Sequence, residues 1–145
     1  MSRANEDLVL RFNRDYINTG DHGVIHEFLT PDCSMYANDE LEASDAAGYA
    51  AMMDAFRTAF PDLEHTTDEI LSADDWVVER FTTRGTHLGE FDAIPPTRKR
   101  VEFTGTSVFR IRDSRIAEER TSVDLLALMR QLGVIPVPEE AAAVT

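Results

Sequence analysis

The sequence predicts an α+β domain: a cone-shaped, curved antiparallel β-sheet packed on three N-terminal helices, with a short C-terminal helix. Apolar residues recur with a helical period of about 3.6 in the N-terminal part and then alternate residue by residue, as in strands. Helices followed by a strand meander are typical of this fold class, and such a cone leaves a pocket between sheet and helices. The 145 residues suit one domain, so we assign residues 1–135 to it and expect residues 136–145 to be a frayed tail.

Three helices are expected before the meander of four consecutive strands. Residues 5–18 form the first, which Gly20 ends, and residues 22–29 form a short second helix. The third begins after a cap at Ser44 or Asp45 and ends before Pro61. The apolar faces of the first and third helices consist of Leu8, Val9, Phe12, Tyr16, Ile17, Tyr49, Met52, Met53, Phe56 and Phe60.

Strands are expected in one short segment before the third helix and in four consecutive segments after it. The alternation is clearest in the fourth strand, where apolar and small residues occupy every second position. A last helix then precedes Gly133, a residue that commonly ends helices. The expected strands are residues 33–37, 63–71, 76–86, 101–111 and 116–123, and the last helix is residues 124–132.

Charge and composition restrict the partners. The net charge of −13 opposes binding to nucleic acid or to an anionic membrane. No apolar run approaches the ~20 residues of a membrane span, and the N-terminus has no signal-peptide pattern. The single Cys33 suits a reducing cytoplasm. His22 and His26 have the spacing of metal ligands on a helix, but no third histidine is close in sequence, so we interpret them as surface residues and expect no metal site.

Several segments resemble the SnoaL-like polyketide cyclases, which have the nuclear transport factor 2-like cone fold. The resemblance covers nearly the whole chain and implies a homodimer with a pocket for a small apolar ligand such as a polyketide. It also implies acid/base catalysis without metal or cofactor, by aldol-type cyclisation or isomerisation; relatives include cofactor-free hydroxylases and epoxide hydrolases. The segments are AFPD (59–62), VVERFTTRGTHLGEF (77–91), IPPTRKRV (94–101), FRIRDSRIAEER (109–120) and DLLALMRQLG (124–133).

The chain departs from the family at the catalytic positions. The acid/base aspartate of the cyclases matches Thr121, and the polar pair on the preceding strand matches Gly105 and Ser107. A non-catalytic small-molecule-binding protein of the same fold is therefore the alternative to an enzyme.

Asp124 and His87 are the candidate catalytic residues. Asp124 can be an acid/base at the pocket rim, or a helix cap whose hydrogen bonds favour the anion and lower the pKa of the carboxyl. His87 has a side chain whose ordinary pKa of ~6.5 suits a general base at neutral pH, or it is a structural hydrogen-bonding residue at a strand end.

Further candidates would bind the ligand. Arg80 and Arg120 can stabilise an oxyanion and Glu118 can take a proton, or the three can form ion pairs that point outward. Tyr16 and Tyr36 can place hydroxyl groups in the cavity, and the apolar candidates can line it or belong to the core. The expected ligand-binding residues are Tyr16, Tyr36, Met52, Phe56, Trp76, Arg80, Phe103, Ser107, Phe109, Glu118, Arg120 and Thr121.

Overall fold

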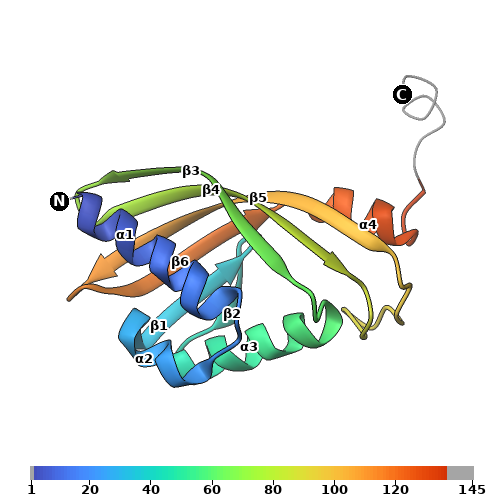
Figure 1. Ribbon diagram of the computed structural model, residues 1–145, viewed down its shortest axis with the longest axis horizontal. Coiled ribbons are helices and arrows are strands. Elements are labelled where there is room, and N and C mark those ends of the chain that lie inside the picture. Colours follow the sequence, from blue (N-terminus) through green and yellow to red (C-terminus); the bar gives the residue numbers. More distant parts are fainter. Residues whose placement is uncertain (1, 137–145) are drawn as a thin grey trace.

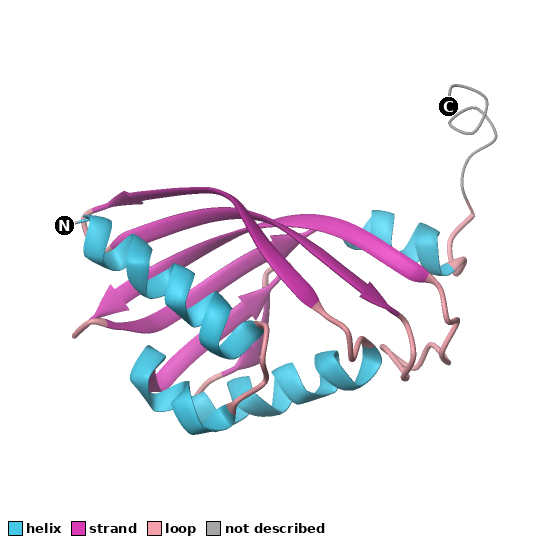
Figure 2. Ribbon diagram, in the orientation of Figure 1, coloured by secondary structure: helices cyan, strands magenta, loops and turns pink. Residues whose placement is uncertain are grey.

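Residues 2–136, which this computed structural model describes, form a curved sheet of six strands with helices on its concave side (Figures 1 and 2). The expected tail is therefore outside the described residues, apart from its first residue. The helical segments are α1 (Ser2–Phe12), a π-helical segment (Asn13–Ile17), a 3₁₀ turn (His22–Val24), α2 (Ile25–Phe28), α3 (Ala46–Ala59) and α4 (Leu125–Leu132). The strands are β1 (Leu29–Ala37), β2 (Glu40–Ala43), β3 (Glu64–Ala73), β4 (Trp76–Thr86), β5 (Arg100–Arg112) and β6 (Arg115–Val123).

The sheet is mixed, which corrects the prediction of a wholly antiparallel one. Its strand order is β2-β1-β6-β5-β4-β3, and β1 pairs with β6 in parallel. The remaining neighbouring strands pair antiparallel. The parallel pair forms because α3 carries the chain from β2, at one edge of the sheet, to β3 at the other. The meander from β3 to β6 then returns to lie beside β1.

The first two strands differ from the sequence prediction. β1 starts at Leu29 and includes Pro31, whereas the pattern predicts a strand only over residues 33–37. Pairing of β1 with β6 is irregular between Leu29 and Ser34, so the ladder there does not depend on the amide hydrogen that proline lacks. β2 was not predicted because its residues are mostly exposed and show no apolar alternation.

The expected helices are present. α1 and the π-helical segment together cover nearly the residues predicted for the first helix. Asp45 is the cap of α3, and its carboxylate accepts a hydrogen bond from the Gly48 amide at 2.7 Å. Gly133 ends α4 with a φ of 83°, a left-handed conformation that glycine adopts readily. Within residues 2–136, no helix has the length and apolar character needed to cross a bilayer.

The main core lies between the helices and the concave face of the sheet. Phe12 is central to it, with ring centroids 5.6 Å from Tyr16, 5.8 Å from Phe28 and 5.9 Å from Tyr49. These separations suit favourable aromatic packing. Because Tyr49 of α3 is held in this cluster, the position of its hydroxyl group above the sheet is fixed.

Alternation in β5 follows the sequence prediction, with Phe103, Ser107 and Phe109 buried on the concave face. Gly105 lies on the same face at a close approach between strands. A Cβ atom there would lie 2.5 Å from Cζ of Phe81 and 2.8 Å from the Ser122 carbonyl oxygen. Only glycine therefore leaves room for the Phe81 ring at this point of the concave face.

Candidate active site

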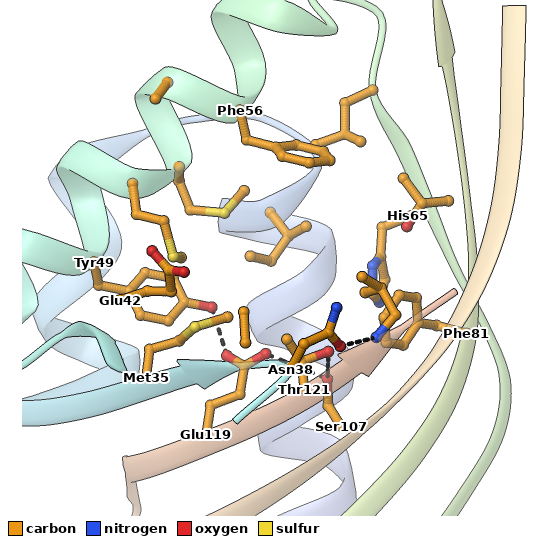
Figure 3. A pocket seen from close by; sticks show the side chains of 18 of the residues that line it. Met35, Asn38, Glu42, Tyr49, Phe56, His65, Phe81, Ser107, Glu119 and Thr121 are labelled. Carbon is orange, nitrogen blue, oxygen red and sulfur yellow. Dashed lines mark hydrogen bonds between the residues drawn. The ribbon is translucent and has the colours of Figure 1, made fainter. Parts of the chain in front are cut away.

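A cavity of about 800 Å³ lies between the concave face of the sheet and α3. This volume is in the range of small-molecule sites. Figure 3 shows Phe56 on the helix side of the cavity and Ser107, Glu119 and Thr121 on the strand side. The apolar side chains that line it include Phe12, Ile17, Met35, Met52, Met53, Phe56, Leu63, Phe81, Phe91, Phe103, Phe109 and Leu128.

Glu119 is a buried carboxylate in the wall of this cavity, and it is 7% exposed. The Tyr49 hydroxyl donates a hydrogen bond to Oε1 of Glu119 at 2.6 Å (Figure 3). The Ser107 hydroxyl lies 3.3 Å from Oε2 of Glu119 and 2.9 Å from Oγ1 of Thr121. Since a hydroxyl group has one proton, Ser107 donates to only one of these oxygens at a time, so Oε2 is left with capacity to accept a further proton.

The environment of Glu119 shifts its proton affinity strongly. The pKa of this carboxyl group is raised to about 7, mainly by burial and also by the charge of Glu79, while the hydrogen bonds from Tyr49 and Ser107 and the charge of His65 oppose the shift. The pKa of Tyr49 is raised well above 10, mainly by burial, so the phenol keeps the proton that it donates. Glu119 can therefore exchange a proton near neutral pH, as a general acid or base requires.

A second buried carboxylate, Glu79 of β4, lines the same cavity. Strand register places Glu79 beside Ser107 of β5 and Ser107 beside Thr121 of β6. Oε2 of Glu79 accepts hydrogen bonds from Nδ2 of Asn13 at 2.8 Å and from the Thr67 hydroxyl at 2.6 Å. Nε2 of His65 lies 3.0 Å from the same oxygen.

Six of the residues that the sequence nominates for ligand binding line the cavity. The apolar ones are on α3 and β5, and the hydroxyl-bearing ones are next to Glu119. They are Met52, Phe56, Phe103, Ser107, Phe109 and Thr121.

Asp124 lies outside the cavity lining and caps α4. Its Oδ1 accepts a hydrogen bond from the Ala127 amide at 3.0 Å, which confirms the capping alternative. His87 is also outside the lining and is fully buried against Phe60, with ring centroids 5.5 Å apart. The Thr97 amide donates to Nδ1 of His87 at 3.1 Å, so this ring holds the loop after β4. Neither side chain is therefore part of the cavity wall in this structure.

The charged candidates lie on the other face of the sheet. Nε of Arg80 is 2.5 Å from Glu69, and Nε of Arg120 is 2.8 Å from Glu118, so both arginines are in ion pairs. The Arg120 guanidinium also lies over the ring of Tyr36, 3.9 Å from its centroid. These side chains point away from the cavity because strand residues alternate between faces.

The homodimer expected from the sequence stays a prediction.

The remaining candidates also lie elsewhere. Trp76 is 37% exposed and stacks with the Arg110 guanidinium, whose Cζ is 5.2 Å from the ring centroid. Tyr16 is a core residue with its hydroxyl 3.3 Å from Nδ1 of His22, and burial raises the pKa of this phenol to about 12. Nε2 of His22 is 2.7 Å from Asp54. Across residues 2–136, no group of three His, Cys, Asp or Glu side chains is placed to hold a metal ion.

Four further polar residues line the cavity that the sequence pattern did not identify as candidates: Tyr49, His65, Glu79 and Glu119. A β-bulge explains the choice of Glu118 over Glu119: Ile116 pairs with Ile111 and Glu118 with Arg110, which leaves Ala117 as an extra residue. Counting back from Thr121 in steps of two gives Glu119, whereas counting forward from the apolar Ile116 gives Glu118. Counting the alternation back from the C-terminal end of the strand was therefore the signal that could have identified the buried carboxylate.

A cone-shaped α+β domain with an apolar cavity between helices and sheet is the fold of the nuclear transport factor 2-like class. Within that class, the chain belongs to the SnoaL-like polyketide cyclase family, whose model matches residues 7–132. This confirms the resemblance noted in the sequence. The chain is 32% identical over 141 residues to the aklanonic acid methyl ester cyclase DauD of Streptomyces sp. (strain C5), covering 92% of this chain and 84% of DauD.

Two solved structures share the fold over almost the whole chain. AclR, a proposed hydroxylase of Streptomyces galilaeus, superposes with a TM-score of 0.82 at 28% identity, covering 97% of this chain and 88% of AclR. IdmH, a proposed polyketide cyclase of Streptomyces antibioticus, superposes with a TM-score of 0.77 at 28% identity, covering 89% and 98%.

Proposed function

We propose that this protein is a polyketide-type cyclase that acts by proton transfer at Glu119, without a cofactor. The observation that carries the proposal is a carboxyl group with a pKa of about 7 in the wall of an apolar cavity of about 800 Å³. A base of this strength is half ionised at neutral pH and can both take and return a proton. Membership of a cyclase family supports the reaction class, although the family aspartate is replaced by Thr121.

The reaction is an intramolecular aldol closure. The ionised Glu119 removes a proton from a carbon next to a carbonyl group, and the electron pair forms a carbon–carbon bond to a second carbonyl carbon of the same molecule. The π electrons of that carbonyl move to its oxygen, which takes up a proton. The product is an isomer of the substrate, and no oxidant or reductant is consumed.

The charge of the cavity favours an uncharged substrate. Within residues 2–136, carboxylate side chains line the cavity and no lysine or arginine does. A substrate carboxylate would meet like charge without a lysine or arginine partner, which is unfavourable in a partly enclosed site. An ester of the kind that DauD's name describes avoids this repulsion. The carboxylates are Glu40, Glu42, Glu79, Glu90, Asp92 and Glu119.

The test is turnover of aklanonic acid methyl ester, hereafter the probe ester, followed by mass spectrometry and NMR of the product. We expect an isomer of unchanged mass from the wild-type protein, no product from Glu119→Gln, and no turnover of the corresponding free acid. Glutamine keeps an acceptor for the Tyr49 hydroxyl but cannot accept the substrate proton. Asp124→Asn is the matched control, because its carboxylate lies outside the cavity, and it is expected to retain turnover.

Other outcomes would identify the rival functions. A product with an added oxygen atom would indicate a hydroxylase, and a product with added water would indicate a hydrolase acting on an epoxide or ester. Binding that raises the melting temperature without any product would indicate a non-catalytic binding protein. Any of these results, or full activity in Glu119→Gln, would refute the proposed cyclisation at Glu119.

A further inference from the structure

We propose that His65, held by Glu79, is the general acid of this cavity and protonates the carbonyl oxygen of the substrate through Nδ1. The inference rests on the proposed function, since it assigns the proton donor that the aldol step needs opposite Glu119. His65 lies on β3 and Glu119 on β6, and both line the cavity. Figure 3 shows His65 and Phe81 on the side of the cavity opposite Tyr49 and Met35.

The His65 ring is fixed in orientation by its neighbours. It stacks on the ring of Phe81, with centroids 4.5 Å apart and an interplanar angle of 25°. The side-chain amide of Asn18 makes two hydrogen bonds to its backbone: the His65 amide donates to Oδ1 of Asn18 at 2.7 Å, and Nδ2 of Asn18 donates to the His65 carbonyl at 3.0 Å. A side chain held in this way loses little freedom when it meets a ligand.

Glu79 determines which nitrogen of His65 faces a ligand. Nε2 of His65 lies 3.0 Å from Oε2 of Glu79, and the side chain of Glu79 is 0% exposed. This contact makes Nε2–H the donor to the carboxylate and leaves Nδ1, for which residues 2–136 supply no hydrogen-bond partner. The His65 side chain keeps 11% exposure, and it lines the cavity. A carboxylate paired with one ring nitrogen also stabilises the imidazolium that a proton donor must form.

The hydrogen bonds of Glu79 are distributed unequally between its two carboxylate oxygens, which is unusual for a structural ion pair. Three donors, from Asn13, Thr67 and His65, converge on Oε2, whereas buried Oε1 has no hydrogen-bond partner among the described residues. A structural carboxylate would normally have both oxygens satisfied. The hydrogen bonds from Asn13 and Thr67 hold Oε2 of Glu79 next to Nε2 of His65, so Glu79 acts as a positioning residue for that ring.

Glu119 and His65 each carry out one of the two proton transfers of the aldol step. Glu119 takes the proton from the carbon, the new carbon–carbon bond forms, and the developing alkoxide takes the Nδ1 proton of the His65 imidazolium. The step ends with a protonated Glu119 and a neutral His65, and transfer of one proton between them through water restores both. The curvature of the sheet turns side chains from β3 and β6 toward the same space, and the charge of His65 lowers the pKa of Glu119.

The kinetic test compares His65→Gln and Glu79→Gln with wild type on the probe ester. Glutamine can still donate a hydrogen bond to Glu79 but cannot transfer a proton. We expect kcat to fall at least about 100-fold in His65→Gln, with KM changed only a few-fold. Glu79→Gln is expected to lower kcat about tenfold, again with little change in KM. His22→Gln is the matched control, because His22 also pairs with a carboxylate but lies outside the cavity, and it is expected to keep wild-type kcat.

A second readout follows the ring nitrogens directly. In ¹⁵N-histidine-labelled Glu119→Gln, which is expected to bind the probe ester without converting it, the Nδ1 resonance of His65 should shift when the ester is added. The His65 signals are identified by their absence from the spectrum of the variant that also carries His65→Gln. Ester binding that leaves these signals unmoved would overturn the inference.

The outcomes separate the inference from the proposed function. Turnover by wild type together with undiminished kcat in His65→Gln would overturn the role of His65 and leave the cyclase proposal standing. Absence of turnover by wild type would overturn the cyclase proposal, and the role of His65 as its acid with it. Loss of kcat in a folded His65→Gln, with the Nδ1 shift, supports the inference.

Discussion

Replacement of Glu119 by glutamine is predicted to change how the stability of the fold depends on pH. The pKa of Glu119 is about 7 in the folded protein and 4.5 in the reference state. The folded protein therefore binds this proton more tightly than the unfolded chain does. The resulting stability is fully present below pH 4.5, and it is lost as the pH rises through 7.

The magnitude follows from those two values. Between pH 5 and pH 8, Glu119 makes wild type lose about 2–3 kcal/mol of unfolding free energy, because each unit of pKa difference is worth about 1.4 kcal/mol. Glutamine does not titrate, so the stability of Glu119→Gln relative to wild type should increase by the same amount over this range. For a chain of this size, that corresponds to a change in relative melting temperature of roughly 5–10 °C.

The assay is urea unfolding of both proteins at pH 5 and pH 8, which requires no substrate. Glu118→Gln is the matched control, because it removes the adjacent carboxylate on the outer face, where Glu118 pairs with Arg120. The control is expected to keep the pH dependence of wild type. If Glu119→Gln also keeps it, the carboxyl group of Glu119 does not hold its proton near neutral pH, and the reasoning fails.

Three other substitutions test the surroundings of the site. Tyr49→Phe removes the hydrogen bond that lowers the pKa of Glu119, so the acidic limb of the pH–rate profile should move above pH 7, which kinetics at several pH values would measure. Asp124→Ala removes the cap of α4 and should cost about 1 kcal/mol in urea unfolding without lowering kcat. Gly105→Ala places a methyl group against Phe81 and should destabilise the fold by about 1–3 kcal/mol, also measured in urea; unchanged stability would show that the strands can separate there.

Most of the fold could be predicted because its signals are local. The period of α3 and its cap at Asp45, the alternation of β5 and the end of α4 at Gly133 are each written within a few neighbouring residues. The parallel pairing of β1 with β6 joins segments about eighty residues apart, and no local pattern indicates it. Such pairing depends on the path of the whole chain, so the sequence predicted the strands but not the mixed sheet.

The candidate site was harder to predict because it depends on which face of a strand is buried. Trp76 and Arg80 share one face of β4, and both were candidate ligand-binding residues. The structure instead buries Val77, Glu79 and Phe81, and the indole of Trp76 lies on the outer face against Arg110. Glu79 lies between Val77 and Phe81 on this face, but a glutamate in a strand ordinarily predicts an exposed position. Only the neighbours that other strands and the π-helical segment bring to it, Asn13 among them, reveal a buried carboxylate.

The pH dependence of kcat/KM for the probe ester tests the central claim most directly. If Glu119 is the base, kcat/KM should rise about tenfold per pH unit on the acidic side and bend near pH 7, where half of the carboxyl groups have lost their proton. The same limb should be absent from any residual activity of Glu119→Gln. A limb that bends near pH 4.5, or a rate that does not change between pH 5 and pH 7, would contradict the account.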